Sequence, residues 1–266
     1  MVKIYKNYAD EPDPVFLPLP EDLAAHFYDL EMAAFADDIA FYQEFLPASG
    51  MVLEIGCGSG RVARRLASAE RPLLGIDISP AMAARAAAHH HPHCRFCVMD
   101  MLAPAFSTTF AAVLLPYNTL NLLSTPEAIA TCLRAIHALL DDHGRLLLQL
   151  FLPTTAMQSG KGTQFQFQIF ELPEGGRLIK EIRTTLQPAT ATLEHEERYL
   201  LRPTGPGAIN RNYRNCRAIA APPQSTWLEL FAEAGFSRLA CWGDYHPIPY
   251  DPATSPLGLF ALQKIS

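Results

Sequence analysis

Glycines at alternate positions follow an acidic residue in the segment that begins at Glu54. These are Gly56, Gly58 and Gly60, and glycine can adopt positive φ and bring bare backbone close to a ligand. A helical pattern starts at Arg61, so its dipole would point its positive end at the same place. A dinucleotide-binding loop of the G-x-G-x-x-G type needs a third glycine where the chain has Arg61. The segment therefore indicates a tight cofactor-binding loop, and its spacing disfavours a nicotinamide dinucleotide.

Two further carboxylates stand at the ends of apolar runs that follow this loop. Asp77 ends the run 73–77, about twenty residues after the loop begins, where an α/β sheet places a carboxylate to accept both hydroxyls of a ribose. Asp100 follows the run 94–99, and Met101 comes directly after it. Each carboxylate alone could simply end a strand. Together with the glycine loop they fall at the ends of three successive strands, which indicates a nucleoside-containing cofactor.

These residues resemble the cofactor motifs of the class I S-adenosylmethionine-dependent methyltransferases. Residues 53–61 match that family's glycine loop closely, with its acidic residue at Glu54. The resemblance implies S-adenosylmethionine as the cofactor, with Asp100 hydrogen-bonded to the adenine amino group and Met101 against the ring. The residues that it assigns to the cofactor are Glu54, Gly56, Cys57, Gly58, Gly60, Asp77, Ile78, Asp100, Met101 and Pro116.

The elements that must position these residues alternate between strand and helix over residues 50–152, which predicts a parallel sheet with right-handed crossovers. Residues 153–222 alternate polar and apolar side chains and turn at Gly175–Gly176, which predicts a small antiparallel β insertion. Residues 223–266 predict a helix and a closing hairpin like that of the resembling family. We therefore expect an α/β fold with a Rossmann-like, doubly wound, seven-stranded sheet whose last strand is antiparallel.

The N-terminal part, residues 1–49, precedes this sheet. Prolines over residues 1–20 predict an extended arm, and apolar positions at steps of three and four over 21–46 predict one broken or two consecutive amphipathic helices. The resemblance implies that these helices form a lid over the methionine end of the cofactor, and that the insertion 153–222 covers the acceptor.

The residues proposed for the chemistry lie mainly after the fourth strand of the predicted sheet, 110–115. Its carboxyl end lies in the crevice where open α/β sheets bind ligands, so Tyr117 and Asn118 would face the methyl group or the acceptor. The tetrad of Asn or Asp followed by Pro-Pro-Tyr is absent, which disfavours nucleobases and glutamine amides as acceptors. The candidate catalytic residues are Tyr117, Tyr28 and His246, and the candidate substrate-binding residues are Asn118 and Tyr245. For Tyr28, plain helix packing remains an alternative.

Composition and charge limit the kinds of partner that the chain is expected to bind. Its 266 residues carry a formal net charge of −6 with a pI near 5.8, which argues against a broad nucleic-acid surface. The sequence shows no signal peptide and no membrane-spanning apolar run, and six scattered cysteines fit reduced thiols. Cys94 and Cys97 would point to opposite faces of a strand, and the histidine run just before them falls on a helix end and a loop, so we predict no metal site. We expect a cytoplasmic protein with a small-molecule acceptor, and the oligomeric state is left open.

The function predicted is methyl transfer from S-adenosylmethionine to a small-molecule N or O acceptor. The cofactor activates the electrophile, so the protein would act mainly by positioning the acceptor for in-line displacement and by excluding water. Two alternatives remain: a non-catalytic S-adenosylmethionine-binding protein, and an aminopropyltransferase-like enzyme whose acidic polyamine signature is not apparent here.

Overall fold

A seven-stranded sheet forms the centre of the chain in the computed structural model, which describes residues 15–159, 163–255 and 257–265. The strand order is β11-β12-β6-β5-β2-β3-β4. Pairing is parallel from β4 to β6 and antiparallel at β12, which lies between β6 and β11. The predicted doubly wound sheet with an antiparallel last strand is confirmed. The bounds are β2 (Val52–Ile55), β3 (Leu73–Asp77), β4 (Cys94–Val98), β5 (Phe110–Leu115), β6 (Leu140–Phe151), β11 (Phe236–Trp242) and β12 (Leu257–Lys264).

Helices cover both faces of this sheet. On one face, α2 (Ile39–Phe45) and α3 (Arg61–Leu66) pack on β2, β5 and β6. On the other face lie α5 (Pro126–Leu139) and α7 (Gln224–Glu233), while α4 (Pro80–Ala88) contacts β3 and β4. Because both faces are covered, β2 is buried at every position, as its apolar run, interrupted only by Glu54, predicts.

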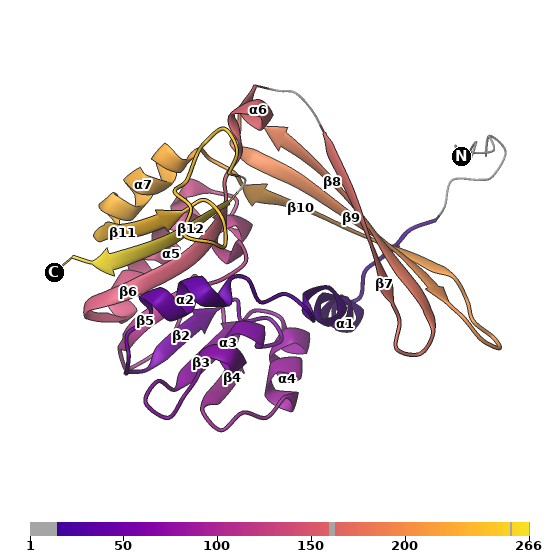
Figure 1. Ribbon diagram of the computed structural model, residues 1–266, viewed down its shortest axis with the longest axis horizontal. Coiled ribbons are helices and arrows are strands. Elements are labelled where there is room, and N and C mark those ends of the chain that lie inside the picture. The colour runs from indigo at the N-terminus through magenta and orange to yellow at the C-terminus, as the bar shows by residue number, and fades with distance from the viewer. Residues whose placement is uncertain (1–14, 160–162, 256, 266) are drawn as a thin grey trace.

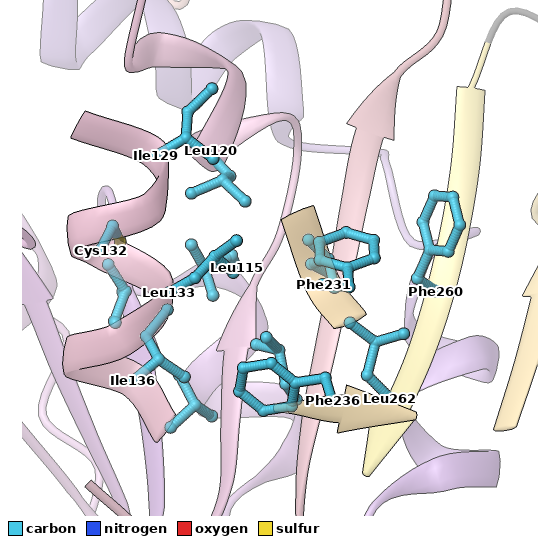
Figure 2. Close-up of a cluster of buried hydrophobic side chains, with 14 of the residues drawn as sticks. Leu115, Leu120, Ile129, Cys132, Leu133, Ile136, Phe231, Phe236, Phe260 and Leu262 are labelled. Carbon is cyan, nitrogen blue, oxygen red and sulfur yellow. The ribbon is translucent and has the colours of Figure 1, made fainter. Parts of the chain in front are cut away.

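The α5 side of the core shows how the sequence specifies this packing. Thr125 caps α5 by accepting a hydrogen bond from the backbone of Ala128, and Pro126 occupies the first turn. Apolar side chains at steps of three and four then point from α5 toward β5, and Phe231 of α7 packs on Phe260 of β12 with ring centroids 5.5 Å apart. Figure 2 shows this cluster, in which the α5 residues are Ile129, Cys132, Leu133 and Ile136.

One predicted helix start is wrong. The spacing of Thr226 and Glu229 predicts a capping box with the helix starting at Trp227, but α7 begins three residues earlier at Gln224, after Pro223. Proline at the position before the helix already has the extended backbone that a helix entry requires, with φ −64° and ψ 161°. The C-terminal stop at Gly235, with φ +84°, is as predicted.

The insertion forms a second sheet, in the order β1-β10-β9-β8-β7. Its strands are β7 (Gln164–Glu171), β8 (Gly176–Gln187), β9 (Thr192–Pro203), β10 (Arg211–Ala220) and β1 (Leu17–Pro18). The antiparallel part is as predicted, although β10 is a full strand of 10 residues rather than a short one. One edge of this sheet differs from the prediction. Leu17 of β1 pairs in parallel with Tyr213 of β10, so the end of the predicted N-terminal arm adds a strand to the sheet of the insertion. Residues 1–14 of that arm lie outside the described residues.

The helix α1 (Glu21–Met32) lies between the two sheets in Figure 1. The second sheet extends to one side of the first. The short helix α6 (Thr155–Gln158) follows β6 and precedes β7, and it lies at the top of the view. For residues 21–46 the sequence predicts one broken helix or two consecutive helices, and the structure shows two, α1 and α2. No helix in the described part of the chain is long and apolar enough to cross a membrane.

The buried side chain of Asn121 links the second sheet to the first by hydrogen bonds. Asn121 lies in the 3-10 helix η1 (Thr119–Leu122) and is fully buried. Its Nδ2 donates to the carbonyl oxygens of Ala220 at 2.7 Å and of Phe151 at 3.2 Å, and its Oδ1 accepts from the Phe151 backbone N–H at 3.0 Å. The end of β10 and the end of β6 are thereby held together at the segment that follows β5.

Candidate active site

One pocket of about 470 Å³ lies between the carboxyl ends of the first sheet, α1 and the inner face of the second sheet. Most residues at its first-sheet end come from the glycine loop and the segments after β3 and β5. The residues used below are Tyr28, Glu31, Glu54, Gly56, Cys57, Gly58, Arg61, Asp77, Pro116, Tyr117, Asn118, Lys180, His195, Glu197, Tyr199, Asn215 and Arg217.

The glycine loop needs its glycines for two reasons. Gly56, Gly58 and Gly60 all have positive φ, at 68°, 54° and 78°, a region that other residues rarely adopt. A Cβ at Gly56 would also lie 2.5 Å from the Thr119 side chain. The loop therefore brings backbone to the pocket in a shape that substituted residues would not allow.

Asp77 holds the glycine loop from the end of β3. Its Oδ2 accepts a hydrogen bond from the Gly58 backbone N–H at 2.8 Å, and its Oδ1 accepts from the Ser79 N–H at 2.9 Å. The carboxylate lines the pocket and is only partly buried. It is thus held in place by backbone donors and still accessible to a ligand, as a ribose-binding acid must be.

Glu54 is buried at the base of the loop with one oxygen unpaired. Its side chain is 1% exposed, and Oε2 has no hydrogen-bond partner among the described residues. Burial raises the pKa of Glu54 to about 8, against the lowering effect of Arg61. A buried oxygen of this kind is rare in folded proteins, so the site suits a cationic or hydrogen-bond-donating ligand group.

Arg61 connects the glycine loop to the segment between α1 and α2. It stands at the start of α3 and forms a two-armed ion pair with the fully buried Asp38, with Nη1–Oδ1 at 2.8 Å and Nη2–Oδ2 at 2.5 Å. Its guanidinium also lies over the Phe35 ring, 5.0 Å from the centroid. Arg61, which stands where a dinucleotide-binding loop has its third glycine, therefore holds the segment between α1 and α2 against the glycine loop.

Tyr117 and Asn118 occupy strained backbone at the end of β5. Their φ values are +51° and +64°, which are unfavourable for residues with side chains and concentrate at functional sites. Tyr117 lines the pocket and packs edge-on against Phe35, with ring centroids 6.0 Å apart. The strain turns the chain from β5 into η1 within two residues and places both side chains on the pocket.

The two tyrosines proposed for catalysis, Tyr28 and Tyr117, are poor bases at neutral pH. Burial raises the pKa of Tyr28 well above its ordinary value, although Arg61 lowers it. The Tyr117 side chain is partly exposed as a whole, but burial of its hydroxyl end raises its pKa too, and Lys180 lowers it. Both hydroxyls stay protonated near neutral pH and can donate hydrogen bonds.

The structure brings some predicted site residues into the pocket and leaves others outside it. Of the cofactor set, Glu54, Gly56, Cys57, Gly58, Asp77 and Pro116 line the pocket, and Gly60, Ile78, Asp100 and Met101 do not. Ile78 is 68% exposed, and Asp100 accepts a hydrogen bond from the Leu102 N–H beyond β4. Ile78, Asp100 and Met101 would contact only a ligand that extends beyond the end of β3.

The predicted residues of the closing hairpin do not line the pocket. His246 is exposed in the loop between β11 and β12, so the structure gives no support to it as a base. Tyr245 packs against Phe35 with ring centroids 5.1 Å apart and supports the lid from behind. Among the candidate acceptor-binding residues, only Asn118 reaches the pocket directly.

A buried charged group on the second-sheet side is absent from the sequence-based predictions. Lys180 Nζ of β8 lies 2.6 Å from Glu31 Oε2 of α1 and 2.7 Å from Glu197 Oε1 of β9. Glu197 Oε2 accepts from Arg217 at 2.6 Å and Asn215 at 3.2 Å of β10. The available sequence signal is that positions 195, 197 and 199 share one face of a strand, but it does not say that this face is covered.

No arrangement for a metal ion emerges within residues 15–159, 163–255 and 257–265. No group of three or more His, Cys, Asp or Glu side chains in those ranges could hold one. The charged side chains on the inner face of the second sheet pair with one another instead.

Comparisons with known proteins agree with this geometry. Residues 52–144 match the family model described as a methyltransferase domain, and no curated protein matches the chain. The sugar N-methyltransferase KedS8 from Streptoalloteichus is 18% identical with a TM-score of 0.73, over 100% of this chain and 99% of that one. CalS10, an amino pentose methyltransferase from Micromonospora echinaspora solved with S-adenosylmethionine bound, is 20% identical with a TM-score of 0.68, over 96% and 100%.

A third solved structure, an S-adenosylmethionine-dependent methyltransferase from Clostridium acetobutylicum, is 12% identical with a TM-score of 0.72, over 91% and 98% of the two chains. These likenesses extend over both sheets. They establish the fold of the whole chain, with the second sheet as part of it.

Proposed function

We propose that this chain, whose residues 52–144 are a methyltransferase domain, transfers a methyl group from S-adenosylmethionine to an amino nitrogen of a small-molecule acceptor. The observation that carries this proposal is the single pocket that joins the glycine loop to the charged inner face of the second sheet. A donor held at one end and an acceptor held at the other would meet beside Tyr117.

The first-sheet end of the pocket fits the cofactor. Bound there, S-adenosylmethionine supplies a methyl group already activated by a positively charged sulfur. Asp77 would accept the ribose hydroxyls, and the unpaired Glu54 oxygen would accept a hydrogen bond from the amino group of the methionine part. Ile78, Asp100 and Met101 would lie along the adenine, beyond the end of β3.

The second-sheet end favours an amine over a hydroxyl as acceptor. Near neutral pH four carboxylates line the pocket against three cationic side chains, because Glu54 with its pKa of about 8 is mostly protonated; the resulting charge favours a cation. The carboxylates are Glu21, Glu31, Asp77 and Glu197, and the cations are Arg61, Lys180 and Arg217. A hydroxyl needs a strong base, and the three pocket tyrosines, Tyr28, Tyr117 and Tyr199, remain protonated. An amine needs only to lose its extra proton before it attacks. The names of KedS8 and CalS10 as a sugar N-methyltransferase and an amino pentose methyltransferase agree with this choice.

Calorimetric titration and a transfer assay test the proposal together. We expect S-adenosylmethionine and S-adenosylhomocysteine to bind with a Kd of about 1 μM, or about −8 kcal/mol, and NAD not to bind. With S-adenosylmethionine present, mass spectrometry should show one added methyl group on members of a small amine panel and none on the matching alcohols. Cofactor binding without transfer to any acceptor would favour the non-catalytic alternative, and transfer to the alcohols alone would overturn the choice of nitrogen.

The raised pKa of Glu54 predicts that cofactor affinity depends on pH. Below a pKa of about 8 the free protein holds Glu54 protonated, whereas a bound ammonium group favours the carboxylate, so binding releases a proton. Affinity should therefore rise with pH by up to about tenfold per unit below pH 8 and level off above it. The free protein should show the opposite trend, because a raised pKa in the folded state means that stability falls as pH rises from 4.5 to about 8.

Calorimetric titrations from pH 6 to pH 9, within about one to two units of that pKa, measure the affinity, and urea unfolding from pH 4.5 to about 8 measures the stability. Glu54→Gln is the matched variant for both. The glutamine has no titrating group, so its affinity should be lower at pH 8 and nearly independent of pH. A wild-type affinity that does not change across this range would show that Glu54 does not face the ammonium group.

A further inference from the structure

Glu31 is a largely buried acidic side chain on the second-sheet side of the pocket, and one of its oxygens is unused. Its side chain is 13% exposed, and its Oε2 accepts from Lys180 Nζ at 2.6 Å. Its Oε1 is buried and has no hydrogen-bond partner among the described residues. Glu31 also lines the pocket. Because buried polar atoms nearly always have partners, this oxygen is placed for a donor that a ligand brings.

The charged groups beside Glu31 already form ion pairs and hydrogen bonds with one another. Glu197 uses Oε1 for Lys180 and for His195 at 3.4 Å, and Oε2 for Arg217 and Asn215. Burial alone would raise the pKa of Glu197, but the hydrogen bond from His195 and the charges of Lys180 and Arg217 lower it well below its ordinary value. Glu197 therefore stays ionised, and both of its carboxylate oxygens already have partners.

Lys180 cannot serve as a base either. Burial would lower its pKa, but Glu197 and Glu31 on either side of it raise the pKa above its ordinary value, so the ammonium remains charged. Its position between the two carboxylates orients Glu31 and leaves Oε1 toward the pocket.

The surroundings of Glu31 place it at the reaction centre. It is faced by Lys180 from β8, Glu197 and Tyr199 from β9, and Tyr117 from the end of β5. Burial raises the pKa of Glu31, and Lys180 lowers it. A carboxylate with a raised pKa is a better proton acceptor than an ordinary glutamate. The charge of Glu31 also acts on the Tyr117 hydroxyl, so the carboxylate and the segment that follows β5 share one part of the pocket.

We propose that Glu31 binds the protonated amino group of the acceptor through Oε1 and removes one proton from it before methyl transfer. This inference rests on the proposed function and adds to it the base that sequence reasoning left undecided. It also names the acceptor class: a primary or secondary amine that enters as its ammonium ion.

The step balances as follows in protons and electrons. An acceptor R–NH₃⁺ gives one proton to the Glu31 carboxylate, which becomes a neutral carboxyl, and the nitrogen keeps the electron pair of the broken N–H bond. That pair forms the new N–C bond to the methyl carbon, while the electrons of the S–C bond return to sulfur. The product leaves as R–NH₂⁺–CH₃, and Glu31 returns its proton to solvent when the pocket opens.

A binding comparison tests the ammonium contact without requiring turnover. The probes are trans-2-aminocyclohexanol and trans-cyclohexane-1,2-diol, titrated by NMR into the protein loaded with S-adenosylhomocysteine. We expect the amine to bind the wild type at least about tenfold more tightly than the diol. Glu31→Gln should remove that difference and leave diol binding unchanged. Its amide oxygen still accepts from Lys180, so the fold should be kept.

A matched control is Asp22→Asn, which removes the same charge from an exposed position on α1. It should bind both probes as the wild type does. If the amine binds the wild type no better than the diol, or if Glu31→Gln binds the amine like the wild type, the role of Glu31 is overturned.

A pH profile tests the proton transfer. With an amine that the wild type methylates, Glu31→Gln should lower kcat by about 100-fold at pH 7, with S-adenosylmethionine binding unchanged. The deficit should shrink about tenfold per pH unit toward the pKa of the amine, because the free amine then supplies its own lone pair. A deficit that is constant with pH would refute the base. A wild type that methylates no amine would refute the proposed function, and the binding comparison would still decide whether Glu31 holds the ammonium.

Discussion

Replacing Asp38 by alanine is expected to lower the free energy of unfolding by about 3–5 kcal/mol. Asp38 is fully buried and holds both arms of the Arg61 guanidinium. The Arg61 side chain is only 8% exposed, so alanine would leave a buried positive charge with no countercharge. Urea unfolding followed by circular dichroism measures the loss.

The neighbouring Asp37 provides the control. It is exposed, so Asp37→Ala should change the free energy of unfolding by no more than about 0.5 kcal/mol. The double variant Asp38→Leu with Arg61→Met removes both charges and fills the space, and it should recover most of the stability lost in Asp38→Ala. Equal stability of Asp37→Ala and Asp38→Ala would mean that the ion pair does not hold the lid.

Replacing Asp77 by alanine is expected to weaken S-adenosylmethionine binding by about 10- to 100-fold. Removing hydrogen bonds to a charged group costs about 1.5–3 kcal/mol, and 1.4 kcal/mol corresponds to tenfold in Kd. The carboxylate would contact the ribose, and it also holds the backbone N–H groups of Gly58 and Ser79. Both the direct contact and the loop that it fixes would be lost.

Calorimetry with S-adenosylmethionine measures this effect, and Asp142→Ala is the matched control. Asp142 is exposed near the start of β6, at the opposite end of the strand from the pocket, so its removal should leave the affinity unchanged. Circular dichroism should show a folded Asp77→Ala protein. An affinity equal to that of the Asp142→Ala variant would remove Asp77 from the cofactor site.

The central sheet and the cofactor side of the pocket could be predicted from the sequence because their signals are local. The apolar run 52–55, the glycines after it and the carboxylate at Asp77 lie within a short stretch of chain. Parallel strands then bring their carboxyl ends to one edge. The structure confirms this sheet and brings Glu54, Gly58 and Asp77 together at its edge.

The acceptor side could not be predicted because it depends on pairings between distant residues. Lys180 and Glu31 are 149 positions apart in the chain, and Leu17 pairs with Tyr213. Alternation along β9 shows which side chains share a face, but only tertiary structure shows that α1 covers it. The strain at Tyr117, with φ +51°, is likewise invisible in the sequence, because tyrosine rarely adopts positive φ.

The joint at Asn121 has a consequence for how proteins of this fold can diverge. All three of its hydrogen bonds are to backbone atoms, at Phe151 and Ala220. These hydrogen bonds therefore impose no side-chain identity on the second sheet, and substitutions on the inner faces of β8, β9 and β10, where we propose that the acceptor binds, would leave them in place. An evolving lineage, or an engineer exchanging residues 153–220 between homologues, could therefore vary the acceptor half independently of the cofactor half, provided that this asparagine is kept.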